Sequence, residues 1–135
     1  MYNLERLTGE ICVQNIKIAV IDDEQGILLT LQLYLEMEGF IALVFSSPIE
    51  ALKVINSENV DIIILDMKMP EMDGEELAKI FKRNQETKDI PIILFSAHET
   101  VSEVAIRVGA YGILEKPFQF EELNKMIKEI IINLK

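Results

Sequence analysis

Short runs of branched apolar residues recur along this chain and constrain its fold more than any other feature. Five runs can be read directly from the sequence, at residues 16–21, 41–45, 61–65, 90–95 and 111–114. They are apolar almost throughout and lack the alternation of polar and apolar residues that marks a strand with one face in water. The runs therefore predict buried strands of a parallel sheet that is covered on both faces.

The stretches between these runs carry apolar residues at helical spacing. In the stretch after the first run these residues are Ile27, Leu28, Leu31 and Leu35. In the stretch after the last run they are Phe120, Leu123, Ile127, Ile130 and Leu134. Spacing of three and four residues predicts helices with one apolar stripe. Strand and helix thus alternate five times, which predicts an α/β fold: a doubly wound (βα)5 domain with a five-stranded parallel sheet and helices on both faces.

Capping signals support these boundaries. A capping residue stands three positions before a glutamate at Ser47-Pro48 with Glu50, at Asp73 with Glu76, and at Thr100 with Glu103. Gly39 and Gly109 follow the first and fourth helical patterns, where a residue in the left-handed conformation commonly ends a helix. We expect one domain over residues 16–135, preceded by an N-terminal extension (1–15) whose pattern fits a short helix, a tail or the end of a longer segment.

Composition excludes several classes of protein. The formal net charge of −10 disfavours direct binding of nucleic acid, because binding to a phosphate backbone requires a basic surface. No run of eighteen apolar residues or basic leader with an apolar block is present, so we expect neither a membrane segment nor secretion. Cys12 has no second cysteine to pair with, which excludes a disulfide framework within the chain. A cytoplasmic location is the expectation that follows.

Polar residues follow four of the predicted strands. They are Asp22, Asp23 and Glu24 after the first, Asp66 after the third, Ser96 after the fourth, and Glu115, Lys116 and Pro117 after the fifth. Each has an ordinary structural explanation when taken alone. Asp22 with Gln25 fits a capping box, Asp66 fits a turn, and Lys116 fits a surface amine. In an open parallel sheet, however, the carboxyl ends of the strands share one edge, where ligands bind.

The expected convergence of carboxylates favours a metal site. Two like charges about 4 Å apart repel by roughly 4 kcal/mol at an effective dielectric near 20, so gathered carboxylates need a cation. Carboxylate oxygens are ligands that suit Mg²⁺, which leaves positions open for a phosphate. One carboxylate could then act as a nucleophile toward phosphorus, with the Ser96 hydroxyl and the Lys116 ammonium contacting the phosphoryl oxygens.

Four motifs in order resemble the receiver domain of bacterial two-component response regulators. They are IAVIDDE (18–24), IIILDMKMPEMDGEEL (62–77), PIILFSA (91–97) and GILEKPF (112–118). The resemblance covers residues 16–135 and implies the flavodoxin-like strand order 2-1-3-4-5. It implies that Asp66 is the phosphoacceptor, and that the Mg²⁺ site comprises Asp22, Asp23, Asp66 and the backbone carbonyl of Lys68.

The resemblance also implies how such a site is used. Ser96 and Lys116 would contact the phosphoryl group, and the Lys116-Pro117 bond would be cis. The phosphoryl donor would be a sensor histidine kinase or a histidine phosphotransfer protein. The fourth helix, fifth strand and fifth helix would present the output surface to a downstream protein or, on phosphorylation, to a second copy. The chain would act as a signalling domain with self-phosphorylation and autodephosphorylation chemistry, and not as an enzyme.

Two positions depart from the pattern or vary in it. Family members commonly carry a switching aromatic ring three residues before the lysine, whereas this chain has Ile113 there and Tyr111 two residues earlier. We expect Tyr111 to be a strand residue that packs on the fourth helix. His98, two residues after Ser96, is expected to be a solvated loop residue.

Other functions remain open at this point. One is a Mg²⁺-dependent phosphatase or phosphotransferase acting through Asp66. The adjacent Asp22 and Asp23, in place of Asp-x-Asp, and the lack of a cap insertion disfavour it. The complete set of site residues disfavours a scaffold that is never phosphorylated. The acids after the first strand disfavour flavin binding, which needs a phosphate-binding loop there. The chain fits a stand-alone receiver or a fragment of a longer regulator.

Overall fold

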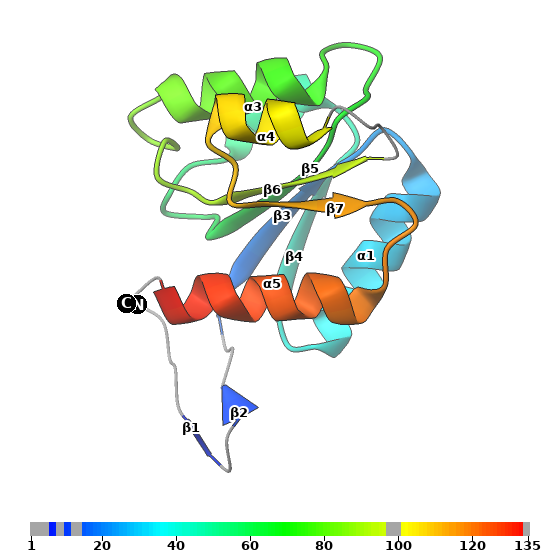
Figure 1. Cartoon of the computed structure of the whole chain (residues 1–135), viewed down its shortest axis with the longest axis vertical. Helices are drawn as coiled ribbons and strands as arrows, with labels where there is room; N and C mark the ends of the chain where they lie inside the picture. Colours follow the sequence, from blue (N-terminus) through cyan, green and yellow to red (C-terminus); the bar gives the residue numbers. More distant parts are fainter. Residues whose placement is uncertain (1–5, 8–9, 12–14, 97–100, 134–135) are drawn as a thin grey trace.

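The computed structural model describes residues 6–7, 10–11, 15–96 and 101–133. Its main sheet has five parallel strands (Figure 1): β3 (Lys17–Ile21), β4 (Ile41–Phe45), β5 (Ile62–Asp66), β6 (Ile92–Ser96) and β7 (Gly112–Glu115). Their spatial order is β4-β3-β5-β6-β7, which is 2-1-3-4-5 when only these five strands are numbered along the chain. The predicted sheet is thus confirmed.

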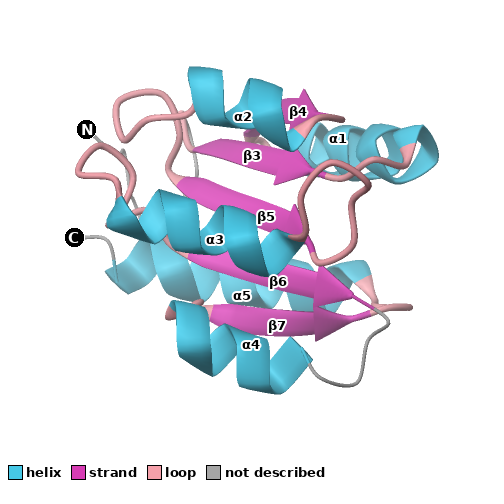
Figure 2. Cartoon of the chain, turned by 90° about the horizontal axis from the view of Figure 1, so that it is seen from above, coloured by secondary structure: helices cyan, strands magenta, loops and turns pink. Residues whose placement is uncertain are grey.

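Five helices cover the two faces of this sheet. They are α1 (Gln25–Met37), α2 (Pro48–Val54), α3 (Gly74–Arg83), α4 (Val101–Val108) and α5 (Phe120–Asn133). Helices α1 and α5 lie on one face, and α2, α3 and α4 lie on the other (Figures 1 and 2). This placement is the doubly wound arrangement that the alternation of strands and helices predicts.

The core consists of two apolar clusters, one on each side of the sheet. In β3, Ile18 and Val20 face α1 and α5, whereas Ala19 and Ile21 face the other three helices. Because both faces are covered, every residue of β5 and β6 is buried. The apolar runs lack polar alternation for this reason, since no residue of these central strands has a side that faces water.

Local capping follows the sequence signals. Ser47 Oγ accepts a hydrogen bond from the Glu50 N–H (3.4 Å), and Asp73 Oδ1 accepts one from the Glu76 N–H (2.8 Å). Gly39 and Gly109 have positive φ angles of 95° and 69°. The two predicted N-terminal caps and the two predicted glycine ends are confirmed. The predicted cap at position 100 lies outside the described residues.

The strand boundaries differ from the prediction by one or two residues. Strands β5, β6 and β7 each begin later than predicted, and each ends one residue later, at Asp66, Ser96 and Glu115. The backbone of these polar residues still pairs with the neighbouring strand, as Asp66 does with Phe95 and Ser96 with Glu115. Asp66 and Ser96 therefore belong to the sheet itself, so rigid backbone fixes their positions.

The segment before the sheet contains an antiparallel pair of two-residue strands, β1 (Arg6–Leu7) and β2 (Glu10–Ile11). This pair projects away from the layered domain in Figure 1. The described residues 6–7 and 10–11 of this segment are therefore strand and not helix. Among the described residues, no helix combines the length and the apolar character needed to cross a membrane.

Truncation of a central strand should test the buried core. Ile64 is fully buried in β5, so we expect Ile64→Ala to lower the free energy of unfolding by about 2–5 kcal/mol. Ile106→Ala makes the same change at a side chain that is 82% exposed and should cost less than about 0.5 kcal/mol. Urea unfolding measures both, and equal losses would contradict the assigned burial.

Candidate functional site

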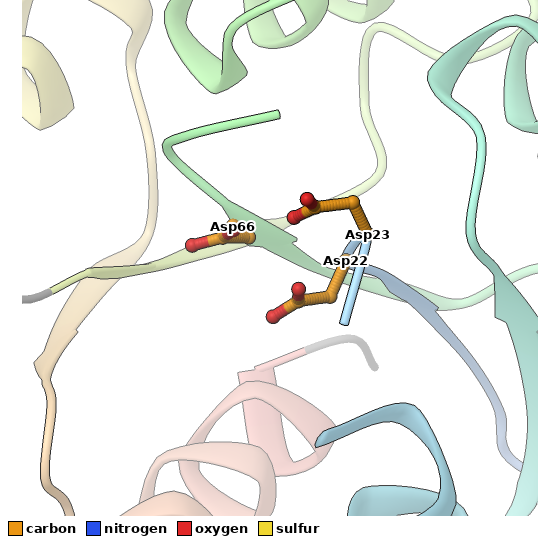
Figure 3. A group of neighbouring side chains, drawn as sticks. All are labelled: Asp22, Asp23 and Asp66. Atoms are coloured by element: carbon orange, nitrogen blue, oxygen red, sulfur yellow. The ribbon is translucent and has the colours of Figure 1, made fainter. Parts of the chain in front are cut away.

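Three carboxylates meet at the carboxyl edge of the sheet. Asp22 and Asp23 follow β3, and Asp66 ends the adjacent β5, so their side chains come from the two strands at the centre of the fold. Each offers an oxygen atom, and these atoms all lie within 4.8 Å of one another (Figure 3). The convergence that the sequence predicted is present in the structure, with Asp22 and Asp66 buried and Asp23 exposed.

The side chain of Asp22 belongs to this carboxylate cluster and does not cap helix α1. Its Oδ1 accepts a hydrogen bond from the Glu24 N–H (2.9 Å), which shapes the loop before α1. The helix begins after Glu24, which forms no side-chain capping bond, so the capping-box explanation of Asp22 with Gln25 is wrong. The second oxygen, Oδ2, is buried and has no hydrogen-bond partner among the described residues.

Burial and neighbouring charges make Asp22 hard to ionise. Desolvation is the largest cause and raises the pKa of Asp22 to about 6, and the negative charges of Asp66 and Asp23 add to this effect. The Glu24 N–H and the Lys116 ammonium act in the opposite direction on the same pKa. A carboxylate kept in such a place, with one buried oxygen that accepts no hydrogen bond from the described residues, suits a cation that binds oxygen ligands. The residues present therefore fit a divalent metal ion.

Asp66 is the carboxylate on which the other groups converge. It is 4% exposed, and desolvation raises its pKa, whereas the Lys116 ammonium and the backbone N–H of Lys68 act to lower it. Lys116 Nζ lies 3.3 Å from Asp66 Oδ1 and 3.6 Å from Asp22 Oδ2. One ammonium thus spans the two buried carboxylates. It also lies 4.7 Å from the centre of the Phe95 ring, a contact that favours a cation.

Backbone contacts bring Ser96 and Lys116 to the same edge. Ser96 ends β6 and is 4% exposed, and its carbonyl accepts a hydrogen bond from the Lys116 N–H (3.0 Å). The Lys116-Pro117 peptide bond is cis, as expected. The side chain of Lys68 is exposed, and position 98 lies outside the described residues. The structure therefore brings Asp22, Asp23, Asp66, Ser96 and Lys116 to one edge.

Sequence reasoning missed the role of Gly74. The loop after β5 folds back so that the Gly74 N–H donates to the Met67 carbonyl (2.8 Å). A Cβ atom at Gly74 would overlap the carbonyl oxygen of Asp66 and the Cα of Met67. Only glycine lets the first turn of α3 approach the backbone of Asp66 this closely. The Asp-Gly pair marks a turn in the sequence, but it does not reveal what the turn approaches.

A hollow of about 530 Å³ opens beside the carboxylates. Its walls come from the start of α1 and from the segment that joins β7 to α5. The lining is mostly apolar and consists of Glu24, Gly26, Ile27, Thr30, Leu31, Phe95, Lys116, Pro117, Phe118 and Phe120. Lys116 contributes both to this hollow and to the carboxylate cluster. No single sequence motif marks the hollow, because its residues come from segments far apart in the chain.

Comparison with known proteins identifies the family. A family model described as the response regulator receiver domain matches residues 18–128. The chain belongs to this receiver domain family. Its curated relatives include the transcriptional regulatory protein PhoP for alkaline phosphatase synthesis of Bacillus subtilis, 34% identical over 119 residues, with 87% of this chain and 49% of the relative covered. The response regulator SaeR of Staphylococcus aureus is 35% identical over 120 residues, with 86% and 50% covered.

Solved receiver domains have the same fold. The receiver domain of the Francisella response regulator 1452 superposes with a TM-score of 0.81 at 30% identity, covering 90% of this chain and all of that one (100%). The chemotaxis protein CheY4 of Vibrio cholerae gives a TM-score of 0.77 at 27% identity, with 87% and 99% covered. This chain is therefore a signalling domain of two-component systems. It spans about half the length of PhoP and SaeR.

The position of Tyr111 in this receiver domain differs from our expectation. Tyr111 directly precedes β7 and is 42% exposed, so it is not the strand residue that we expected. Ile113 is the residue that packs, half-buried, against the cluster under α2, α3 and α4. The backbone N–H of Tyr111 still donates to the Ile92 carbonyl (2.8 Å), just ahead of the strand.

Addition of one methyl group should test the close approach at Gly74. We expect Gly74→Ala to lower the free energy of unfolding by about 1–3 kcal/mol, because the new Cβ overlaps backbone that side-chain rotation cannot move. Gly26→Ala is the matched control, since no atom lies within 4 Å of a Cβ there. Helix propensity predicts that this control is neutral or stabilising by up to about 1 kcal/mol. Chemical unfolding distinguishes these results, and equal effects would contradict the contact.

Proposed function

We propose that Asp66 accepts a phosphoryl group and that the chain is switched by this modification. The observation that carries the proposal is the position of Asp66 at the centre of the carboxyl edge, beside the oxygens of Asp22 and Asp23 and 3.3 Å from the Lys116 ammonium. The family supports a signalling use of these groups. We also propose that the receiver domain spans residues 16–135 and that residues 1–15 are an extension.

The proposed cofactor is Mg²⁺, held by Asp22, Asp23, Asp66 and the backbone carbonyl of Lys68. The buried Oδ2 of Asp22, which accepts no hydrogen bond from the described residues and lies 3.6 Å from the Lys116 ammonium, supports this set, as does the oxygen-only chemistry of the three carboxylates. When bound, the ion supplies positive charge that offsets the repulsion between an anionic nucleophile and an anionic donor. The protein residues provide the nucleophile and the remaining contacts to the phosphoryl group.

The proposed reaction transfers a phosphoryl group from the phosphohistidine of a sensor histidine kinase or a histidine phosphotransfer protein. A carboxylate oxygen of Asp66 forms a bond to phosphorus while the bond between phosphorus and the donor's imidazole nitrogen breaks. The electron pair leaves on that nitrogen. The Ser96 hydroxyl and the Lys116 ammonium then donate hydrogen bonds to phosphoryl oxygens. Water attack on the same phosphorus would reverse the modification.

Among the described residues, buried core side chains surround Asp66 away from the carboxyl edge of the sheet, so we propose that the donor approaches from this edge. The hollow beside Lys116 lies at this edge and is lined by apolar side chains of α1 and α5. We propose that it receives apolar side chains of the donor while the phosphohistidine reaches Asp66. The acidic edge alone would repel a phosphorylated partner, so apolar contact would help to hold the two proteins together.

The proposed output surface comprises α4, β7 and α5. Phosphorylation adds about −1.5 to −2 charge at Asp66 and draws Ser96 and Lys116 toward it. Helix α4 is the next described element after Ser96. Because position 113 carries isoleucine and not an aromatic ring, we propose that α4 carries the signal. Ile106 and Tyr111, 82% and 42% exposed, offer contacts to a downstream protein or to a phosphorylated second copy.

Labelling with a small acyl phosphate should test the acceptor. Incubation with Mg²⁺ should raise the intact mass by one phosphoryl group, and chelation of the metal should prevent it. Asp66→Asn should abolish labelling because the amide is not a nucleophile of this kind. Asp89→Asn, an exposed aspartate before β6, makes the same substitution and should label normally. Full labelling of Asp66→Asn would reject Asp66 as the acceptor.

Thermal unfolding should test the metal site. Mg²⁺ at a hundred times its Kd should stabilise the fold by about 2.7 kcal/mol and raise Tm by several degrees. Asp23→Asn should reduce this rise because it removes one ligand charge while leaving an exposed side chain. Asp89→Asn changes the net charge equally and should respond as the wild type does. A rise that Asp23→Asn leaves intact would point to general screening of an acidic chain.

A further inference from the structure

Helix α4 is held against the domain by a small apolar surface. Its buried side chains, among those described, are Val104, Ala105 and Val108. Helix α3, on the same face of the sheet, buries the larger side chains of Leu77 and Phe81. Because stabilisation by burial follows the apolar area removed from water, core contacts fix α4 less firmly than α3. Polar contacts of α4 therefore have more influence on where this helix lies.

An ion pair joins α4 to α3. Arg107, in the last turn of α4, donates from Nε and Nη2 to the two carboxylate oxygens of Glu75, at 3.1 and 3.0 Å. Isolated ion pairs at a surface contribute little, but a guanidinium bound to both oxygens of one carboxylate is an exception. Lys79 Nζ also lies 3.1 Å from Glu75 Oε2. The hydrogen bonds from Arg107 and Lys79 lower the pKa of Glu75 to about 2, so the pair is charged at neutral pH.

The pair links the two segments that carry the proposed site. Glu75 directly follows Gly74, which lies against the backbone of Asp66. Arg107 belongs to the helix that is the next described element after Ser96. A displacement of α4 relative to α3 therefore changes the distance that the Arg107 side chain has to span. Hydrogen bonds weaken steeply as donor and acceptor leave their optimal geometry, so the pair favours one position of α4.

Both members of the pair have a second partner within their own helix. Glu103 precedes Arg107 by four residues in α4. Glu75 is the main cause of the raised pKa of Arg107, and the charge of Glu103 adds to it. Lys79 follows Glu75 by four residues in α3 and already contacts it. A glutamate four residues before a cation is the favourable orientation for an ion pair within a helix. Opening of the pair between the helices thus leaves each charge with an opposite charge nearby.

We propose that the ion pair between Arg107 and Glu75 is a latch that holds α4 in its unswitched position, and that Arg107 pairs with Glu103 once α4 has moved. The latch acts within the proposed function, on which this inference rests, because α4 carries the signal there. In this structure Lys116 Nζ lies 3.3 Å from a carboxylate oxygen of Asp66, which is the arrangement of the unmodified acceptor. The latch therefore belongs to the state before phosphorylation.

The latch opposes the first event of the proposed switch. Phosphorylation draws Ser96 toward Asp66 and so displaces the start of α4, whereas Arg107 holds the last turn of the same helix to α3. A modification shifts an equilibrium between two positions only by its preference for one of them. The strength of the latch sets how much of this preference is needed. By linkage, a weaker latch favours phosphorylation.

The two glutamates near Arg107 give opposite predictions. Glu75→Gln removes the partner that holds α4 and should favour the displaced position. Glu103→Gln removes the partner that receives the guanidinium after release and should favour the position described here. Arg107→Gln removes both pairings and should have a smaller effect than Glu75→Gln. Glu76→Gln makes the same substitution in the first turn of α3, outside the pair, and should leave α4 where it is.

Distances between spin labels test the latch without any phosphoryl donor. In a Cys12→Ser background, labels at Ile106→Cys on α4 and Met37→Cys on α1 replace side chains that are 82% and 83% exposed. A minor population with a second distance should report the displaced α4. Glu75→Gln should raise this population about two- to fivefold, and Glu103→Gln should lower it about twofold. A single unchanged distance in Glu75→Gln, or equal changes in both glutamate variants, would overturn the proposal.

The rate of labelling by a small acyl phosphate tests the link between the latch and the acceptor. Glu75→Gln should be labelled about two- to fivefold faster than the wild type, and Glu103→Gln more slowly. Equal rates in the wild type and both variants would overturn the latch as a control of phosphorylation. A wild type that is not labelled at all would instead reject Asp66 as the acceptor, and the label distances would still decide whether the pair holds α4.

Discussion

The site depends on two carboxylates that are buried side by side. Asp22 and Asp66 are 0% and 4% exposed, and like charges at such separations repel by roughly 4 kcal/mol at an effective dielectric near 20. The apolar core beneath them cannot offset this repulsion. The Lys116 ammonium, 3.3 and 3.6 Å from the two groups, must therefore be held in place by the end of β7. The strand order places the two carboxylates side by side, and the segment after β7 places the ammonium between them.

The sheet and the convergence of the carboxylates could be predicted because their signals are local. Apolar runs indicate buried strands, and parallel topology brings the carboxyl ends of those strands to one edge whatever their exact length. The caps at Ser47 and Asp73 depend on residues only three positions away and were equally predictable. The family motifs then supplied the strand order, which spacing alone does not determine.

The remaining features depend on contacts between distant segments. The closeness of Gly74 to the backbone of Asp66 arises only when the loop after β5 folds back, and the hollow beside Lys116 needs both α1 and α5. The prediction for Tyr111 failed because it assumed a strand that starts one residue too early. The antiparallel pair before the sheet was not predicted because strands of two residues carry no periodicity.

Helix α1 begins without a side-chain cap, because a glutamate that forms no capping bond occupies its N-cap position. Asp22 Oδ1 binds the Glu24 N–H within the loop, and Glu24 itself forms no capping bond. A good capping residue contributes about 1 kcal/mol, so the first turn of α1 is less stable than its sequence allows. The helix is therefore less rigid next to the site. Opening of its first turn would widen the hollow, because Gly26 and Ile27 form part of the wall of the hollow.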